Sequence, residues 1–296
     1  MIVTDIYNFK PVHQNGSNFI RSLIDFSIYY LSFRPKHSYV ITSQQGLLGH
    51  GSMREWRPYE NSESVIFMLG LIYIRADYRK FGIGELLTNY LLDKNMKESN
   101  LVHANISSEH LPFYIRHGFQ ASFSLIGLLG RLNEFLDIPP ISNRDQIIIR
   151  SLENCDLLDL ATYDRKIHSV YRIQYFEHLR EHIASIAGYV AYSKKTLKII
   201  GYIILNFNQH FIKCGPLFAD HLTIALALLK QSAVDYDGTM LLALPEDNRL
   251  AFKMFESKSF KKTDLLHRVF KGNRNLFDSN SFERVWAITD DWLSLI

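Results

Sequence analysis

Two closely spaced glycines are the residues in this chain that most suggest ligand chemistry. They lie in the segment Arg79-Lys80-Phe81-Gly82-Ile83-Gly84. Glycines at the start of a helix let the backbone approach a ligand, and the first N–H groups of the helix then point toward it. Such amides suit a phosphate or a pyrophosphate. A tight strand-to-helix turn also uses glycine, so the pattern alone fits either interpretation.

The elements around these glycines can be predicted from hydrophobic spacing. Ten apolar residues, 65–74, come first and predict a buried strand, because they are too few to cross a bilayer. A polar turn, 75–78, follows. After the glycines, apolar residues recur at the spacing of an amphipathic helix, at Ile83, Leu86, Leu87, Tyr90 and Leu91. The unit is a strand, a glycine-bearing loop and a helix, and it lacks the full loop pattern of nucleoside triphosphate or dinucleotide sites.

At this point the sequence resembles a known family. The segment 74–84 resembles the signature loop of the GNAT superfamily of acyl-CoA-dependent N-acyltransferases, whose core is R/Q-x-x-G-x-G/A. A second similar element follows, Phe113-Tyr114-Ile115-Arg116-His117-Gly118-Phe119, which matches Y-x-x-x-G-F. The two motifs in this order are much more specific than either one alone.

The resemblance implies that acetyl-CoA is the co-substrate and suggests where it binds. The backbone at the end of the predicted strand should bind the pantetheine arm and the thioester, while the amides of 80–85 should receive the pyrophosphate. Arg79 and Lys80 should add positive charge. The expected cofactor-binding residues are Ile72, Tyr73, Ile74, Arg79, Lys80, Phe81, Gly82, Ile83, Gly84 and Glu85.

Acyl transfer from a thioester also needs a neutral amine and a proton for the departing thiolate. By resemblance Tyr114 is the candidate general acid, since a phenol with a pKa near 10 can donate to a thiolate of similar basicity. A half-buried structural tyrosine is the alternative. Ser107 stands where GNAT proteins usually have asparagine, and this departure weakens the assignment.

A general base is harder to assign. The predicted strand 65–74 carries no acid, whereas several GNAT enzymes keep a glutamate there. The candidates on neighbouring segments are Glu55, Glu63, His50 and His103, of which Glu55 and His103 are retained as catalytic. For each of them, a surface carboxylate or a hydrogen-bonded strand histidine is the favoured interpretation. An amine that arrives deprotonated needs no base.

One segment matches a pattern of zinc ligands. His178-Leu179-Arg180-Glu181-His182 matches H-x-x-E-H, which on a helix places two imidazoles on one face. With 12 histidines in the chain a chance match is easy, and no downstream ligand is evident. A solvated helix face is favoured, and no metal is expected.

Composition narrows the classes of function and the compartment. Hydrophobic residues make up 47% of the 296, and the net charge of +3 is slight, so neither a nucleic-acid partner nor a membrane is expected. Cys155 and Cys214 lack metal-ligand spacing, and no signal peptide is evident, which favours the cytoplasm. A late basic cluster is interpreted as a solvated face, and it comprises Lys258, Lys261, Lys262, Arg268, Lys271 and Arg274.

The second half of the chain repeats the pattern of the first. An apolar strand at 211–218 leads into a helix, and Asn248, Ala251, Phe255 and Phe260 match the family pattern N-x-x-A-x-x-x-Y-x-x-x-x-F. However, no glycine occurs between Gly215 and Gly238, and Phe255 replaces the tyrosine. The second copy is therefore expected to be degenerate and to shape the acceptor side, with a terminal strand at 283–295 closing it.

The remaining elements follow from periodicity and turn residues. Ser108 is expected to cap a helix that contains Pro112. The predicted helices are 18–33, 155–164 and 171–186. The predicted strands are 1–9, 39–43, 47–56, 101–106, 119–129, 147–149, 188–193, 197–207 and 240–244.

Together these features predict an α/β (α+β mixed-sheet) protein of two tandem GNAT domains. The predicted boundaries are an acetyl-CoA-binding domain at 1–130, a linker at 131–145 and a degenerate domain at 146–296. The predicted activity is acetyl-CoA-dependent acetylation of a primary amine on a small molecule or peptide. The alternative is a non-catalytic acyl-CoA-binding or scaffolding protein.

Overall fold

The computed structural model describes residues 2–5, 37–44, 46–57, 63, 65–96, 100–139, 147–168, 170–181, 186–207, 211–272 and 279–288. The helix predicted at 18–33 lies outside these ranges. The elements of the first half are β1 (Ile2–Asp5), β2 (His37–Ser43), β3 (Gly46–Trp56), β4 (Ile66–Ile74), η2 (Ala76–Tyr78), α2 (Ile83–Asn95), β5 (Leu101–Ser107), α3 (Leu111–Arg116), β6 (Gln120–Arg131) and η3 (Leu132–Phe135).

The second half repeats the order of three strands, a helix, a strand, a helix and a strand, and in the described residues it also has two α-helices before this series and one strand after it. Its elements are β7 (Ile147–Ser151), η5 (Leu152–Asn154), α4 (Leu157–His168), α5 (Ile173–Glu181), β8 (Ile186–Ser193), β9 (Ile199–Phe207), β10 (Ile212–Ala219), α6 (Leu222–Asp235), β11 (Thr239–Pro245), α7 (Arg249–Glu256), β12 (Lys261–Gly272), η8 (Ser279–Arg284) and β13 (Val285–Ala287).

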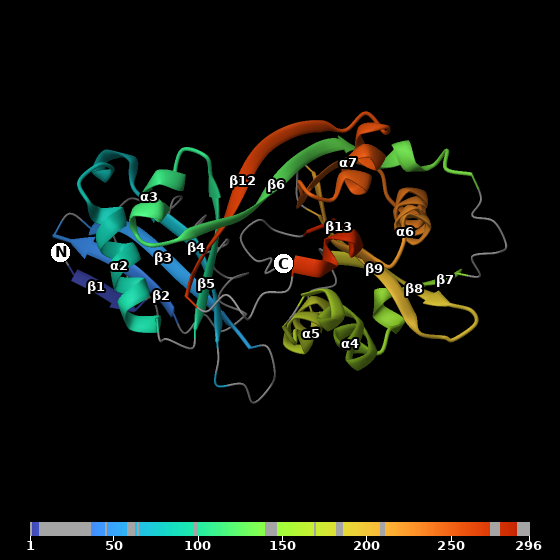
Figure 1. The fold of residues 1–296 in the computed structure, drawn as a ribbon, viewed down its shortest axis with the longest axis horizontal. Helices are drawn as coiled ribbons and strands as arrows, with labels where there is room; N and C mark the ends of the chain where they lie inside the picture. The colour runs from blue at the N-terminus through green and yellow to red at the C-terminus, as the bar shows by residue number, and fades with distance from the viewer. Residues whose placement is uncertain are drawn as a thin grey trace.

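In the described residues, one mixed sheet of 13 strands joins the two halves. Its order is β1-β2-β3-β4-β5-β12-β6-β11-β10-β9-β8-β7, and β13 pairs with β10 off this path. Strands β1 to β6 of the first half correspond to β7 to β12 of the second. If each strand is exchanged for its counterpart, the order read from one end becomes the order read from the other. β12 of the second half therefore lies between β5 and β6 of the first, and β6 pairs with β11. The two exchanged strands run side by side across the top of the molecule (Figure 1).

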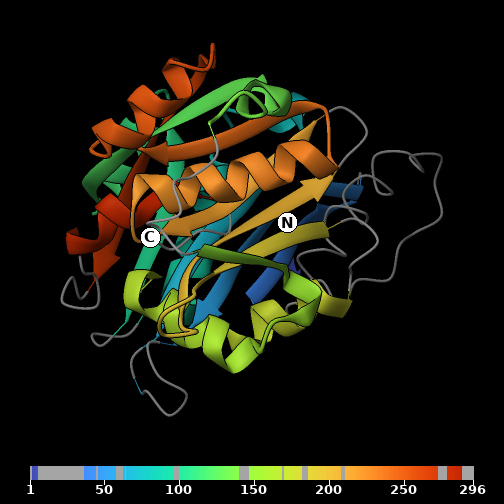
Figure 2. The same cartoon turned by 90° about the vertical axis from the view of Figure 1, so that its right-hand side faces the viewer.

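Strand alternation sorts the core of the second half into two layers. On β9, Ile203 and Leu205 face the cluster that contains α6, whereas Tyr202 and Ile204 face the cluster that contains α4 and α5. The helices therefore cover both faces of this part of the sheet (Figure 2). The cluster that contains α4 and α5 also includes Trp56, Ile66 and Met68 from the first half, so the two copies share a hydrophobic core.

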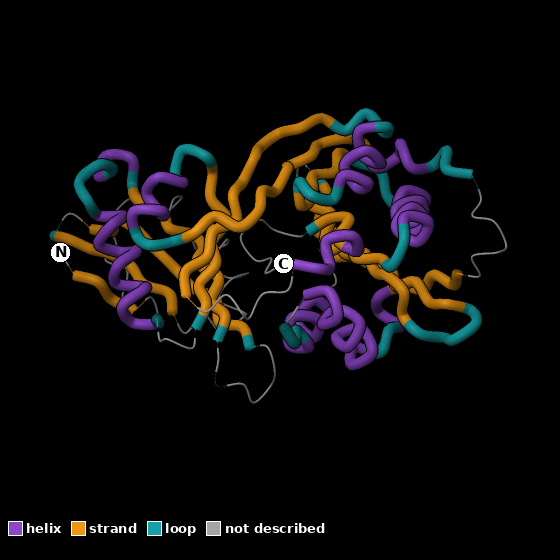
Figure 3. Tube along the Cα trace, viewed as in Figure 1, coloured by secondary structure: helices purple, strands orange, loops and turns teal. Residues whose placement is uncertain are grey.

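Helix α2 packs closely on the sheet of the first half. A Cβ atom on Gly51 of β3 would lie 2.9 Å from side-chain carbons of both Leu87 and Leu91. Glycine at this position therefore lets α2 approach the strand, and Leu87 and Leu91 are fully buried beneath the helix. Figure 3 shows α2 and α3 together on one side of the strands in this half.

Most strands and helices agree with the sequence predictions, and the mixed α/β fold is confirmed. Four local features differ from the predictions. Helix α3 begins at Leu111 with His110 as its cap residue, so Ser108 is not its N-cap. Helix α4 begins at Leu157, later than the predicted 155, and Ile186 begins β8 because its side chain packs into the sheet core. The strand at 261–272 was not predicted.

The late basic cluster is not a single solvated face. Arg268 is fully buried, and its Nε donates a hydrogen bond to Asn105 of β5. Lys271 donates from Nζ to the carbonyl oxygen of His117 at 2.7 Å. Both residues lie on β12, so the strand exchange carries them into the first half, whereas Lys261 and Lys262 stay exposed.

Candidate active site

The end of β4 carries a bulge. Tyr73 pairs with His50 of β3 and Gly70 pairs with Ser52, so β4 has one more residue than β3 between these pairs. The Ser52 hydroxyl donates to the Gly70 carbonyl oxygen at 3.1 Å and supports this irregularity. Bulges bend a strand and redirect its hydrogen-bonding groups, and they are common beside functional sites.

Where the bulge begins, β4 separates from β5. The two parallel strands pair only from Ile66 to Leu69 with residues 101–104. Within the ranges that the structure describes, no strand pairs with this side of β4 beyond Leu69. The backbone of Ile72, Tyr73 and Ile74 therefore borders an opening in the sheet. A backbone edge of this kind can bond an extended ligand arm by the same groups that bond a strand.

The glycine loop lies between this opening and α2. Lys80 and Gly82 have φ angles of 68° and 75°, and Gly82 is the N-cap of α2. The left-handed backbone explains glycine at 82. Gly84 differs, because a Cβ atom there would meet only Cγ1 of Ile74, at 3.7 Å. The protein's own packing therefore leaves space in front of Gly82 and Gly84, next to helix amides that lack intrahelical acceptors.

The charged residues of the loop have different partners. Arg75 forms an ion pair with Asp77 at 2.5 Å, so it is not directed at the glycines. Arg79 donates from Nε to the Ile74 carbonyl oxygen at 3.0 Å, which ties the loop to the end of β4. Lys80 and Phe81 are exposed. These positions leave positive charge beside the first turn of α2, which suits a phosphate-bearing ligand such as the pyrophosphate of coenzyme A.

Glu85 and His117 connect the first turn of α2 to the end of α3. Nε2 of His117 lies 3.8 Å from a carboxylate oxygen of Glu85, and Nδ1 of the same ring lies 2.8 Å from the Phe113 carbonyl oxygen. The helix that carries Tyr114 is thus held next to the glycine loop.

Tyr114 is buried, with 9% of its surface exposed. Its ring makes edge contacts with Phe113 and Phe119, each with centroids 5.3 Å apart. Burial raises the pKa of Tyr114 to about 12, so the phenol stays protonated at neutral pH. Among the described residues, none accepts a hydrogen bond from its hydroxyl. No described residue therefore takes up the hydroxyl proton of Tyr114, and the hydroxyl can donate it to a bound ligand.

The candidate bases lie in different places. Glu55 pairs in register with Phe67, near the start of β4, and its carboxylate bonds Arg57 at 2.6 Å. Glu63 is exposed before β4. His50 is buried and pairs with Tyr73, so the structure places it at the bulge.

His103 is buried on β5, opposite Met68 of β4 and Phe270 of β12. Burial, followed by the nearby charge of Arg268, holds its pKa well below the usual value. The ring is therefore neutral. The structure brings together the glycine loop, the open strand end and the Tyr114 helix, and it does not bring Glu55 to them.

His267 is a residue near this site that the sequence did not indicate. Its Nε2 lies 3.0 Å from the Ser108 hydroxyl and its Nδ1 lies 3.4 Å from the Ser124 hydroxyl. It comes from β12 and therefore from the second half of the chain. The apolar residues Leu265, Leu266, Val269 and Phe270 around it are the one signal for a strand there.

The second half retains the fold but not the loop. Eight residues, 75–82, connect β4 to α2, whereas two residues, 220 and 221, connect β10 to α6. Phe255, in the position of Tyr114, is fully buried against Phe135 and Phe260. The repeat predicted from the sequence is confirmed, and so is the shorter connection.

The described residues contain neither a candidate metal site nor a candidate membrane span. No group of three or more His, Cys, Asp or Glu residues in the described ranges could hold a metal ion, and His182 lies outside them. No helix in those ranges is long and apolar enough to span a bilayer.

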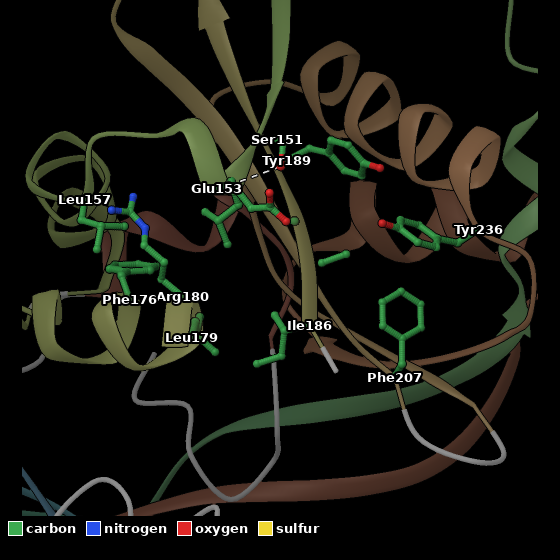
Figure 4. A pocket seen from close by; sticks show the side chains of 13 residues that line it. Ser151, Glu153, Leu157, Phe176, Leu179, Arg180, Ile186, Tyr189, Phe207 and Tyr236 are labelled. Atoms are coloured by element: carbon green, nitrogen blue, oxygen red, sulfur yellow. Dashed lines mark hydrogen bonds between the residues drawn. The ribbon is translucent and has the colours of Figure 1, made fainter. Parts of the chain in front are cut away.

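A pocket of about 400 Å³ in the second half, which Glu153, Ile186 and Phe207 help to line, lies at the sheet end where β10 begins (Figure 4).

Comparisons with known proteins agree with this geometry. Two models of an acetyltransferase (GNAT) domain match the chain, one at residues 34–121 and one at 161–282. An uncharacterized N-acetyltransferase of Bacillus subtilis, YitH, is 20% identical over 196 residues, which cover 66% of this chain and 66% of that protein. The matched region thus spans just under two thirds of that relative.

Two solved structures share the fold over most of the chain. A putative acetyltransferase from Pyrococcus horikoshii superposes with a TM-score of 0.68 at 16% identity, covering 97% of this chain and 88% of that one. A tandem GNAT protein from the clavulanic acid biosynthesis pathway superposes with a TM-score of 0.59 at 13% identity, covering 82% and 83%.

Proposed function

Since this chain belongs to the GNAT superfamily and carries two acetyltransferase (GNAT) domains in tandem, we propose that it transfers an acetyl group from acetyl-CoA to a primary amine. The acceptor is a small molecule or a peptide that binds at the cleft between the copies or at the open edge of the first copy. A protein N-terminus, a lysine and an aminosugar all satisfy this chemistry. Cys155 and Cys214 are free and buried, which fits a reducing compartment such as the cytoplasm.

The observation that carries this proposal is the pairing of an open strand end with a glycine loop. In the part of the chain that the structure describes, the edge of β4 after Leu69 has no strand partner and is available to an extended arm. Glycine at 84 is not required by the fold, since a Cβ atom would make only an ordinary contact there. A ligand that approaches the backbone closely explains why position 84 carries glycine and not a larger residue.

The proposal assigns a role to each part of the first copy. The amides of 80–85 bind the pyrophosphate, with Lys80 and Arg79 nearby, and the backbone of 72–74 binds the pantetheine arm. Acetyl-CoA, when bound, supplies the activated acetyl group. Tyr114 donates a proton to the departing thiolate, which a phenol that stays protonated at neutral pH can do.

The acceptor amine must lose a proton before it can attack the thioester. His50 is the candidate at the bulge, and His103 is a neutral imidazole on the adjacent strand. Glu55 lies opposite Phe67 near the start of β4 and bonds Arg57, so it lies away from the opening. We therefore propose that the amine loses its proton to solvent or to one of these histidines.

A direct test measures thiol release. The purified protein is incubated with acetyl-CoA and a library of amines, and free coenzyme A is followed with a thiol reagent. An amine-dependent release of thiol is expected, with mass spectrometry identifying the acetylated amine. The non-catalytic alternative predicts that the protein binds coenzyme A by calorimetry but that no amine accelerates thiol release.

A further inference from the structure

The opening between β4 and β5 has a counterpart in the second copy. On β10, Cys214 pairs with Leu205 of β9 and Phe218 pairs with Tyr202, so β10 also carries one extra residue between these pairs. Like β4, β10 pairs in parallel with the next strand over a short stretch, Ile212 and Lys213 with residues 240–241, and then separates from it. The second copy therefore has the same gap in the same place.

Residues 285–288 of the chain itself fill this second gap. β13 pairs antiparallel with β10, Ala287 with Leu217 and Val285 with Phe218. Ile288 then bridges to the other side of the gap, where its N–H donates to the Ala243 carbonyl oxygen of β11 at 2.8 Å. The segment thus lies between the two separated strands.

The segment is anchored by buried side chains. Trp286 is 1% exposed, and its indole N–H donates to the Ala219 carbonyl oxygen at 3.0 Å. Nδ2 of Asn248 donates to the carbonyl oxygens of Phe282 and Val285 at 2.9 and 2.8 Å. Asn248 is the asparagine of the family pattern, so the second copy uses that residue to hold this segment. Val285, Ala287 and Ile288 are fully buried.

From this geometry we infer that the gap in the second copy is a strand-binding slot filled by residues 285–288. An extended peptide backbone takes the place that, among the described residues, stays open in the first copy for an extended ligand arm. The ligand class of the second slot is therefore polypeptide, bound within the same chain. It follows, on the basis of the proposed function, that each chain binds one acyl-CoA, in the first copy.

The first experiment uses the unmodified protein. Native mass spectrometry and calorimetry with coenzyme A should give one molecule bound per chain. Hydrogen exchange should show protected amides at 285–288 with or without coenzyme A, and new protection at 70–74 and 80–85 when it is added. Two molecules bound per chain, or rapid exchange at 285–288, would overturn the inference.

A disulfide lock tests the placement directly. In a Cys155→Ser, Cys214→Ser background, Leu217→Cys with Ala287→Cys should form a disulfide, because directly paired strand residues lie close enough to be bridged. The locked protein should bind coenzyme A with an affinity within about twofold of the reduced form. Loss of binding on locking would contradict the inference.

The control places the second cysteine elsewhere on the same segment. Leu217→Cys with Ile288→Cys should not crosslink, because Ile288 is bridged to Ala243 on the other strand. If no coenzyme A binds to any form, the proposed function fails, while the lock and the exchange data still decide whether 285–288 occupies the slot.

Discussion

At the scale of single residues, Gly84 separates ligand binding from folding. Its Cβ position is open except for Ile74 at 3.7 Å, and it lies within the first turn of α2. We expect Gly84→Ala to leave stability unchanged or raise it by up to about 1 kcal/mol, because alanine favours a helix. Coenzyme A affinity should fall at least tenfold, since the added methyl group enters the ligand's space. Urea unfolding and calorimetry measure the two effects.

The control for this variant is Gly51 of β3, which faces the buried side of the same helix. In Gly51→Ala the new Cβ lies 2.9 Å from atoms of Leu87 and Leu91, so we expect destabilisation by about 1–3 kcal/mol from overpacking. Wild-type affinity for coenzyme A in Gly84→Ala would rule out the loop as the pyrophosphate site.

Tyr114 can be tested with a change of one atom. Tyr114→Phe keeps the ring that packs on Phe113 and Phe119 and removes the proton donor. We expect kcat to fall about 10²-fold or more, the range for general acid catalysis, while affinity for coenzyme A stays within about twofold. Steady-state kinetics and calorimetry measure these quantities, and an unchanged kcat would remove the role assigned to this residue.

The raised pKa of Tyr114 also predicts the shape of the pH profile. Burial moves this pKa from 10 to about 12, so the acid form persists across the range in which an acceptor amine loses its proton. We expect kcat to rise from pH 7 to 10 as the amine is deprotonated, without a falling limb from Tyr114. A limb that falls near pH 10 and is absent from Tyr114→Phe would mean that the phenol has an ordinary pKa.

At the scale of elements, a buried ion pair fixes α4 and α5 on β9. Arg172, just before α5, bonds Asp164 of α4 at 2.9 Å through Nε, and both side chains are almost completely buried. The hydroxyl of Tyr202 on β9 donates to the same carboxylate at 2.5 Å. The pair therefore ties two helices to the sheet inside the core that both copies share.

Breaking this pair should be costly. Arg172→Met leaves the Asp164 carboxylate buried without its cation, and we expect a loss of about 3–5 kcal/mol of unfolding free energy. Arg131→Met is the matched control, because the Arg131–Asp237 pair is exposed and should contribute about 1 kcal/mol or less. Equal effects in urea unfolding would show that Asp164 gains other partners.

At the scale of the whole molecule, the exchanged strands make the two copies one folding unit. The first copy without β12 exposes the edges of β5 and β6, and the second without β6 exposes the edge of β11. We expect fragments 1–139 and 147–296 to aggregate or stay unfolded when expressed apart, and to form one complex when expressed together. Size-exclusion chromatography and calorimetry test this, and a monomeric fragment 1–139 that binds coenzyme A would contradict it.

The exchange also brings residues of the second half next to β5 of the first copy. β12 supplies His267 beside Ser108 and buried Arg268 beside Asn105. The prediction that the second copy shapes the acceptor side stays a prediction, but these contacts place second-half residues on both faces of β5. The boundary at 131–145 stays a prediction, and in space the two copies pair through β12 and β6.

The sequence by itself determined the features whose signals are local. Apolar runs and helical spacing fixed β4 and α2, while Gly82 and Gly84 with the Tyr114 motif indicated the loop, the family and the repeat. Missing glycines likewise indicated that the connection before the second helix is shorter in the second copy, and the structure confirms this. These signals work because turns, amphipathic helices and strands depend on residues within a few positions of one another.

Only the tertiary structure decided which strands became neighbours. The place of β12 between β5 and β6, the burial of Arg268 and the contact of His267 with Ser108, 159 positions apart, arise from pairing between the halves. The filling of the second gap by β13 has the same origin. A strand's own residues show that it will pair but not with which edge, because that choice depends on every other edge and on the core that the whole chain encloses.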